Sequence, residues 1–307
     1  MSSPGTTKRS KLVLIDGNAI MHRAYHAMPK LTNRRGEAIG AVYGFTSMLL
    51  KIIEDLKPTH LAVCFDRKEP TFRKKEYKEY QSHRPDTDED LIGQFPVSRK
   101  VAGAMNIPAY DKKGFEADDL IGTISKKSKG RIDEVVIVTG DKDIMQLIDD
   151  RIFVYLPIRG LSQAKMMKRR DVYGKLGVYP EQIIDYKALM GDPSDNYPGV
   201  YGIGPKTAEQ LLGKFKTYSS VYKHLDDISE NTAKKLRDGK EGGDISYKLA
   251  QIVTDVDFDY DLTNMDNWEV NSGDTLKLFD EIGFRSLKKR VEKMGVEREE
   301  EKQGNLF

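Results

Sequence analysis

The stretch Lys11-Leu-Val-Leu-Ile-Asp-Gly-Asn18 is a short apolar run that ends on an aspartate. Two further runs of this kind, His60–Phe65 and Glu134–Val138, occur along the chain. Runs of this length that are rich in β-branched and aromatic residues are typical of buried strands. The segments between them, including Ala41–Leu56 and Asp118–Lys127, carry apolar residues at helical spacing. Strands that alternate with helices predict an α/β fold with a mostly parallel sheet.

The composition of the chain excludes several classes of protein. Of its 307 residues, 38% are hydrophobic and 32% are charged, which is typical of a globular protein with one or two domains. No apolar run approaches the roughly 20 residues of a membrane-spanning helix, and the first ten residues lack the apolar core of a signal peptide. The single cysteine, Cys64, excludes an intramolecular disulfide and a cysteine-based zinc site. We therefore expect a cytosolic protein.

Acidic residues follow each of the three predicted strands. Asp16 and Asp66 come directly after the first two strands, and Asp141-Lys-Asp143 follows the third. Because sites in parallel sheets form at the carboxyl ends of the strands, we expect these acids to meet at one edge of the sheet. Two more acidic clusters lie at the start of a predicted helix and in a turn rich in Gly and Pro. The five clusters contain Asp16, Asp66, Glu116, Asp118, Asp119, Asp141, Asp143, Asp192 and Asp195.

Nine carboxylates in one pocket need compensating cations, because like charges a few Å apart raise one another's pKa. Lys142 is the only base within these motifs, so bound metal ions are the expected source of positive charge. Oxygen ligands without His or Cys favour Mg²⁺ or Mn²⁺, and two such ions can promote phosphodiester hydrolysis. For any single cluster a structural role is the alternative, since Asp118 and Asp119 could be first-turn acids and an Asp after a strand is often an N-cap.

A basic segment with interleaved aromatic residues, Phe72–Arg84, follows Asp66 closely. Its composition suits a single-stranded nucleic acid, with Lys and Arg on phosphates and aromatic rings available for stacking. The alternative is a solvated helix face, in which Lys75 and Glu79 form an ordinary i,i+4 pair. The position of the segment beside Asp66 favours the functional interpretation. The candidate DNA contacts in it are Arg73, Lys74 and Arg84.

The glycine-rich segment Gly199–Thr207 resembles two phosphate-binding motifs and matches neither. Pro205 interrupts the Gly-Lys pair of a Walker A sequence, and Thr207 stands where a dinucleotide motif has its third glycine. A helix–hairpin–helix turn fits better, because its glycines expose backbone N–H groups at a helix N-terminus, where they can bind phosphates. The residues expected to bind the duplex backbone here are Gly202, Gly204, Lys206 and Thr207.

Five motifs of this chain, in this order, resemble the 5′-nuclease (flap endonuclease) family. They are Val13–Asn18, Val42–Phe45, Phe115–Asp119, Thr139–Asp143, and Ala188–Asn196 with its continuation Pro198–Ala208. Within the family, the chain looks most like the 5′–3′ exonuclease domain at the N-terminus of bacterial DNA polymerase I. The resemblance extends over about residues 11–290. It leaves open whether the chain is a standalone nuclease or an excised domain.

The resemblance implies a PIN-like α/β core that holds two Mg²⁺ or Mn²⁺ ions, and a K⁺ ion at the helix–hairpin–helix turn. It also implies cleavage of 5′-flap, nicked or branched DNA and of RNA–DNA hybrids, in primer removal, Okazaki fragment processing and excision repair. The alternatives are a branched-DNA binding module with little catalysis and a phosphatase with an Asp16 nucleophile. The implied ligands are Asp16, Asp66, Glu116 and Asp118 for the first metal, and Asp141, Asp143, Asp192 and Asp195 for the second, with Asp119 beside them.

The arch that this family places over its active site departs from the pattern in this chain. The family has a lysine where this chain has Gln81. Since that lysine is thought to polarise the scissile phosphate, we expect Lys78 or Lys74 to take over its role, or the enzyme to be slower. Arg84 is expected to contact phosphate in either case. We also expect a phosphate contact from Arg23, on the helix predicted after Asp16.

The resemblance also divides the chain into regions. Residues 11–170 would form the core, with a helical arch at about 70–97, and residues 171–292 a helical region that completes the metal site. Residues 293–307 would be a charged, flexible tail of a monomeric protein. The tail ends in a Gln-x-x-Leu-Phe sequence, similar to peptides that bind the bacterial sliding clamp; the alternative is a truncated linker. The expected clamp contacts are Gln303, Leu306 and Phe307, the last two as apolar anchors.

Overall fold

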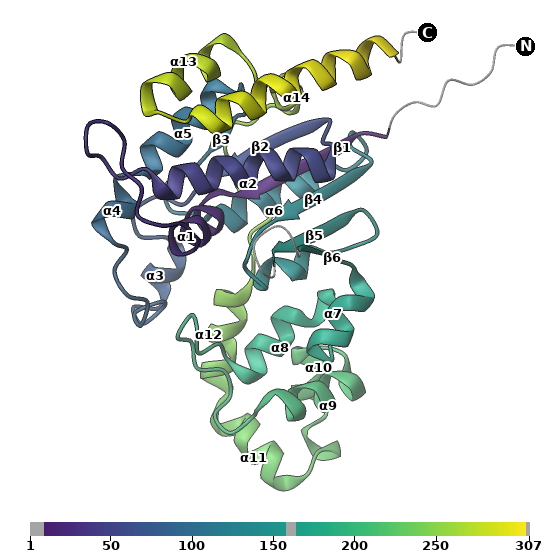
Figure 1. Ribbon diagram of the computed structural model, residues 1–307. Coiled ribbons are helices and arrows are strands. Elements are labelled where there is room, and N and C mark those ends of the chain that lie inside the picture. The colour runs from purple at the N-terminus through teal and green to yellow at the C-terminus, as the bar shows by residue number, and fades with distance from the viewer. Residues whose placement is uncertain (1–8, 158–163, 305–307) are drawn as a thin grey trace, which may run out of the picture.

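The computed structural model describes residues 9–157 and 164–304, and a six-stranded sheet forms its centre (Figure 1). The strands lie in the order β3-β2-β1-β4-β5-β6, and all neighbours are parallel except β5 and β6. The predicted α/β fold with a mostly parallel sheet is thus confirmed. The strands are β1 (Lys11–Asp16), β2 (His60–Cys64), β3 (Ala109–Tyr110), β4 (Glu134–Val138), β5 (Ile152–Pro157) and β6 (Ala164–Met167).

The central strands are apolar on both faces. In β1, Leu12 and Leu14 pack on one face of the sheet, whereas Val13 and Ile15 pack on the other. Both sets are buried because helices cover both sides, and a strand in this position has a continuous apolar sequence rather than an alternating one. This explains why the sequence predicted β1, β2 and β4 correctly.

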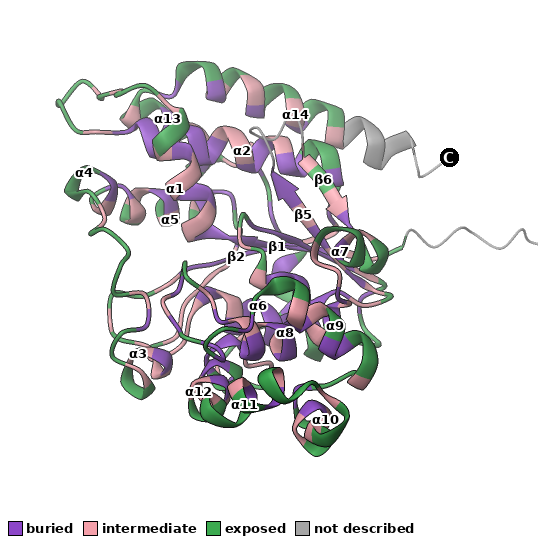
Figure 2. Ribbon diagram, turned by 90° about the horizontal axis from the view of Figure 1, so that it is seen from below, coloured by how far each residue is buried: buried purple, intermediate pink, exposed green. Residues whose placement is uncertain are grey.

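Helices α1 (Gly17–Ala27), α2 (Gly40–Leu56) and α5 (Phe95–Ala104) pack on the first face of the sheet. Helix α6 (Ala117–Lys127) and the short 3-10 helix η1 (Asp143–Leu147) pack on the second face. The helices predicted at 41–56 and 118–127 correspond to α2 and α6 within one residue. In Figure 2 the strands at the centre are buried, while the outer helices are exposed on their outward sides.

A helical region extends the core on the second face. Its apolar residues are continuous with those of α6 and the sheet. It consists of α7 (Arg169–Leu176), α8 (Ile183–Met190), α9 (Pro205–Phe215), α10 (Tyr218–Lys223), α11 (Glu230–Asp238) and α12 (Lys240–Ala250), together with short 3-10 turns.

The end of the chain returns to the first face of the sheet, which differs from the predicted division. Helices α13 (Gly273–Ile282) and α14 (Arg285–Gly304) lie beside α2 and α5 (Figure 1). Arg290 forms an ion pair with Glu54 at 2.8 Å. Residues 273–292, expected to belong to the helical DNA-binding region, therefore pack on the core instead.

The charged run Glu297–Lys302 continues helix α14, whereas the predicted division places it in a flexible tail over residues 293–307. The guanidinium of Arg298 stacks on the ring of Trp268 at 3.6 Å and donates a hydrogen bond to the Trp268 carbonyl oxygen at 2.7 Å. This contact ties the charged part of α14 to the core. Within the described residues, none of the helices has the length and apolar character needed to cross a bilayer.

The segment between β2 and α5 contains two short helices, α3 (Phe72–Glu76) and α4 (Glu89–Ile92). Turns and extended chain connect them over residues 77–88. The expected helical arch is therefore only partly helical. Two short helices of this kind are marginal on their own, so tertiary contacts must hold the segment in place.

Candidate metal centre

Seven of the nine predicted acids line one cleft at the carboxyl edge of the sheet, with a volume of about 730 Å³. Asp16 ends β1, Asp66 follows β2, and Asp141 follows β4. The parallel register of these strands brings the three side chains to the same edge. The seven acids are Asp16, Asp66, Glu116, Asp118, Asp141, Asp143 and Asp195.

Asp16 has a structural role as well as a place in the cleft. Its Oδ1 accepts a hydrogen bond from the Ala19 N–H at 2.9 Å, which caps helix α1, and its Oδ2 accepts one from the Thr139 hydroxyl at 2.7 Å. Burial raises the pKa of the Asp16 carboxyl to about 6. The N-cap role of Asp16 is thus shown, and the residue also lines the cleft in which metal ligands are expected.

The neighbouring acids are held in a similarly desolvated setting. The Asp66 Oδ1 accepts a hydrogen bond from the Ala117 N–H at 2.7 Å, and burial followed by the charge of Asp16 raises the pKa of Asp66 to about 6. Burial also raises the pKa of Glu116 to about 7. The pKa of Asp118 lies well above its usual range, because burial and the charges of the surrounding acids act together.

Four acids of the cleft lack a cationic partner among the described residues. No Lys or Arg of the described ranges forms an ion pair with Asp16, Asp66, Asp118 or Asp141. Carboxylate oxygens that repel one another and form no ion pair with a protein cation provide the hard donor set that divalent ions prefer. The residues present therefore fit a metal site.

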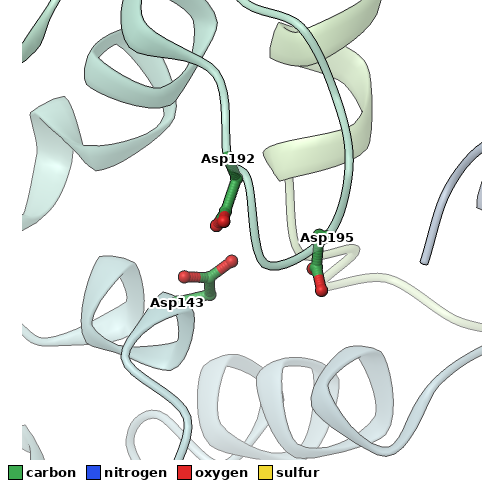
Figure 3. A group of neighbouring side chains, drawn as sticks. All are labelled: Asp143, Asp192 and Asp195. Carbon is green, nitrogen blue, oxygen red and sulfur yellow. The ribbon is translucent and has the colours of Figure 1, made fainter. Parts of the chain in front are cut away.

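A second acidic group lies beside the first, in the helical region. Asp143, Asp192 and Asp195 each offer an oxygen, and these oxygens lie within 4.8 Å of one another. Figure 3 shows the three side chains converging from η1 and from the loop after α8. Asp192 thus joins the centre, although it does not line the cleft itself.

Protein cations occupy this second group, which the sequence analysis did not predict. The Lys187 ammonium bridges Asp143 and Asp192, and the Arg84 guanidinium pairs with Asp195 at 2.5 Å. Burial acts to lower the pKa of Lys187, but the charge of Asp143 and then of other neighbours raises it above its ordinary value. Lys142 is the only base within the acidic motifs, but bases from outside the motifs also reach the site. Lys187 lies outside the acidic motifs in the sequence, on α8, five residues before Asp192.

Arg73 and Asp119 form a buried ion pair that corrects two predictions. Arg73 is 2% exposed and Asp119 is 0% exposed. The two guanidinium nitrogens of Arg73 donate to the two carboxylate oxygens of Asp119, each at 2.8 Å. Asp119 also accepts hydrogen bonds from the N–H groups of Glu116 and Val253. With its oxygens already engaged, Asp119 acts as a structural residue rather than a metal ligand, and Arg73 is not available to DNA.

The remaining arch residues divide into two groups. Lys74, Gln81 and Arg84 line the cleft, whereas Lys78 is exposed outside it. The Gln81 side-chain amide donates to Asp195 Oδ1 at 3.3 Å, and the Gln81 backbone N–H donates to the Asp195 carbonyl oxygen at 2.8 Å. Lys74 donates to the Tyr80 carbonyl oxygen at 2.8 Å. The arch therefore contacts the loop of Asp195 on this side of the cleft.

Tyr80 is a residue of the site that sequence reasoning missed. It is 4% exposed, and its hydroxyl lies 3.3 Å from both Glu116 and Asp195, joining the two acidic groups. Its ring stacks on Tyr197, with the centroids 6.5 Å apart. A tyrosine in a basic segment is predicted to stack on bases, so nothing in the sequence indicated this buried position.

The other predicted DNA contacts lie outside the acidic cleft. Arg23 donates to the Pro157 carbonyl oxygen at 2.6 Å and lines a second pocket. Gly204 precedes the first turn of α9, where Pro205 is the first helical residue. Gly202 has a φ of 78°, the left-handed region that favours glycine. Lys206 is exposed and Thr207 is partly buried.

The predicted clamp peptide falls at the edge of the described chain. Helix α14 ends at Gly304, and the Gln303 side chain lies outside the described residues. Leu306 and Phe307 also lie outside them.

A mostly parallel sheet with acids gathered at its carboxyl edge, joined to a helical region, defines an α/β protein with an acidic centre that suits divalent ions. The comparisons give the family within this class. Residues 11–177 match the model of the N-terminal resolvase-like domain of the 5′–3′ exonucleases, and residues 178–273 match the model of their C-terminal SAM fold. The chain therefore belongs to the 5′–3′ exonuclease family and is a nuclease of that family.

Curated relatives include the DNA polymerases I of two Bacillus species. The chain is 38% identical over 296 residues to that of Bacillus subtilis (strain 168), which covers 96% of this chain and 34% of the relative. It is 39% identical over 292 residues to that of Bacillus caldotenax, which covers 95% and 33%. The chain thus spans about a third of the length of these relatives.

Solved structures share the fold at low sequence identity. The T5 D15 protein, co-crystallised with metal ions, has a TM-score of 0.67 at 21% identity and covers 93% of this chain and 99% of its own. The catalytic core of Rad2 in complex with DNA substrate has a TM-score of 0.59 at 15% identity, with 94% and 92% covered. Human GEN1 in complex with Holliday junction DNA has a TM-score of 0.58 at 16% identity, with 90% and 68% covered.

Proposed function

We propose that this chain is a metal-dependent nuclease that cleaves 5′-flap, nicked or branched DNA and RNA–DNA hybrids near the junction of single strand and duplex. The observation that carries the proposal is the cleft in which four neighbouring acids, Asp16, Asp66, Asp118 and Asp141, form no ion pair with a Lys or Arg of the described residues. Such a set is unfavourable until divalent cations neutralise it. Membership of the 5′–3′ exonuclease family supports the reaction type.

The two acidic groups suit two hard cations, and we propose Mg²⁺ or Mn²⁺. Bound in such a cleft, these ions would make hydroxide available near neutral pH and would stabilise the charge of the attacking and leaving oxygens. The implied ligands are Asp16, Asp66, Glu116 and Asp118 for one ion, and Asp141, Asp143, Asp192 and Asp195 for the other.

The residues around the site orient the acidic ligands and can contact the substrate phosphate. The proposed hydrolysis needs no side-chain nucleophile. The Thr139 hydroxyl and the Ala117 N–H fix the orientation of Asp16 and Asp66. The Arg84 side chain is 52% exposed at the rim of the cleft, so it can transfer from Asp195 to a substrate phosphate. Gln81 can donate a hydrogen bond beside it, although it brings no charge.

The glycine turn before α9 supplies the second element of the proposed function. Its exposed backbone at Gly202 and Gly204, with Lys206 and Thr207, can grip the phosphates of a duplex without reading sequence. A K⁺ ion bound by its carbonyl oxygens is part of this proposal. Removal of K⁺ should then weaken duplex binding more than replacement of Na⁺ by choline.

We place the activity in RNA-primer removal, Okazaki fragment processing and excision repair in the bacterial cytosol, because the relatives are bacterial DNA polymerases I. The protein would act as a monomer. Docking on the sliding clamp through Gln303, Leu306 and Phe307 is a separate proposal, motivated by the sequence alone. Deletion of residues 303–307 should abolish clamp binding in a pull-down and leave cleavage of free flap DNA unchanged.

The decisive assay uses a flap duplex labelled at its 5′ end. We expect release of short labelled fragments with Mg²⁺ and none with EDTA. Tight binding to the flap without fragments would favour a branched-DNA binding module. Release of phosphate from a phosphomonoester alone would favour the phosphatase alternative.

A further inference from the structure

A second pocket adjoins the acidic cleft and has the opposite charge. Its volume is about 700 Å³, and Gly140 lines both cavities. Cations reach it from four separate elements: α1, the turn after β4, β6 and α7. These cations are Arg23, Lys142, Lys165, Arg170 and Lys175, and Asp171 is the one acid among the described residues that line the pocket.

The single acid is already neutralised within the fold. Asp171 pairs with Lys165 at 3.0 Å and accepts a hydrogen bond from the Lys168 N–H at 3.0 Å, which caps α7. It therefore does not offset the other cations of the pocket.

Three of the cations are exposed and can bind an external anion. Lys142, Arg170 and Lys175 are exposed, and within residues 9–157 and 164–304 none of them forms an ion pair. The sequence of residues 158–163 contains no acid that could serve as a partner. By contrast, Arg169 lies between Arg170 and Lys168 in the chain but is committed to Glu181 and to the ring of Tyr179.

The lining of the pocket distinguishes a paired strand from an unpaired one. Sites for single-stranded nucleic acid combine cations with aromatic rings on which bases stack. None of the described residues that line this pocket is aromatic. Cations without stacking surfaces suit the phosphates of a duplex, whose bases are not accessible.

We propose that this basic pocket binds the phosphate backbone of the duplex arm of the substrate, next to the phosphodiester bond held in the acidic cleft. The proposal rests on the proposed function and names a contact for it beyond the glycine turn. Because the two cavities adjoin at Gly140, a strand anchored in the basic pocket is presented to the metal centre. The positive pocket also offsets the repulsion between DNA and the acids of the cleft.

The test compares DNA binding by two double variants of equal charge. Arg170→Gln with Lys175→Gln removes two cations of the pocket, and Lys277→Gln with Lys289→Gln removes two exposed cations of α13 and α14. Fluorescence anisotropy with a plain duplex, a single strand and a 5′ flap, in Ca²⁺ to prevent cleavage, gives the affinity at several salt concentrations. All four side chains are exposed, so both variants should fold. Circular dichroism checks that they do.

We expect the pocket variant to lose affinity for the duplex and the flap about tenfold or more at low salt, with the single strand little affected. The slope of log affinity against log salt should fall by about 0.9 for each lost phosphate contact. The control variant should retain the wild-type slope. Equal losses in both variants, or a loss confined to the single strand, would overturn the proposal. A wild-type protein that binds no DNA would overturn the proposed function along with it.

Discussion

Lys187 places one positive charge between two carboxylates that the family resemblance assigns to a metal ion. Its side chain is 13% exposed, and it bridges Asp143 and Asp192. Removal of one member of a buried ion pair lowers the stability of the fold, because the remaining charge is left uncompensated. The lysine therefore stabilises this group in the metal-free protein and competes with a cation that binds there.

Replacement of Lys187 by methionine should expose this competition. Without the ammonium, Asp143 and Asp192 repel each other, so we expect a lower melting temperature in EDTA and a larger rise on addition of Mn²⁺ than in the wild type. Differential scanning fluorimetry with and without Mn²⁺ measures both quantities. Lys223→Met, at an exposed site on α10, is the control. A rise equal to or below that of the wild type would show that the lysine does not compete with the metal.

Gln81 offers a test of charge at the rim of the cleft. Its φ of 53° is unfavourable for glutamine and lysine alike, so Gln81→Lys adds an ammonium near Asp195 without a new backbone cost. We predict a faster single-turnover cleavage of flap DNA, by up to about 100-fold, because charge stabilisation at a phosphate is of that order. Lys277→Gln, at an exposed site on α13 outside the cleft, should leave the rate unchanged. A large loss in Gln81→Lys would instead make the native amide integral to the site.

For single residues, the sequence predicted where the acids lie in the fold better than it predicted their ion-pair partners. The acids after β1, β2 and β4 could be placed together because parallel strands end at a common edge. The pairing of Arg73 with Asp119 could not be predicted, since 46 residues separate them. In the sequence, Arg73 is one of several bases in a basic segment, and Asp119 is an acid in the first turn of a helix. The same holds for Lys187, which no motif marks as a base of the site.

Among the elements, the segment from α3 to α4 depends most on tertiary contacts. Arg73 ties α3 to α6 through Asp119 and to the end of α12 through the Leu249 carbonyl oxygen at 3.0 Å. Gln81 ties the following turn to the loop of Asp195. These contacts fix a segment whose own helices are too short to be stable alone.

Removal of the Arg73 side chain should therefore be severe. Arg73→Met leaves Asp119 buried without its partner, and loss of one member of a buried pair costs about 3–5 kcal/mol of unfolding free energy. Urea denaturation in EDTA measures the change. Lys75→Met, exposed on the same helix, should stay within about 0.5 kcal/mol of the wild type. A cost below about 1 kcal/mol for Arg73→Met would contradict the structural role assigned to this pair.

The elements that the sequence missed are those without a clear pattern. Strand β3 has two residues, and β6 is an antiparallel edge strand with exposed positions. Helices α13 and α14 have helical sequences, but which face of the sheet they cover depends on contacts such as that between Arg290 and Glu54. Local periodicity carries no information on such long-range packing.

For the molecule as a whole, the acidic cleft makes stability depend on pH and metal. In the metal-free fold the pKa values of Asp16 and Asp66 are about 6 and that of Glu116 is about 7, against ordinary values of 3.8 and 4.5. Between pH 4 and pH 7 the folded state therefore binds more protons than the unfolded chain, so its stability falls as the pH rises.

Thermal melts in EDTA across this range should show a melting temperature that decreases from about pH 5 to pH 7.5 through the contribution of these groups. Addition of Mn²⁺ at pH 7.5 should restore it, since the metal binds the ionised form. Asp141→Asn, with one less carboxylate, should show a smaller Mn²⁺ effect. A melting temperature that rises steadily toward pH 7.5 in EDTA would contradict the assignment of these pKa shifts.

The central claim is that the acids at the carboxyl edge of the sheet gather to hold divalent ions. Calorimetric titration of the metal-free protein with Mn²⁺ at pH 7, in two buffers of different ionisation enthalpy, tests it most directly. We predict binding with release of protons in the wild type, and affinity weakened about tenfold or more in a folded Asp141→Asn variant. No binding by the wild type, or the same affinity and proton release in both proteins, would contradict the claim.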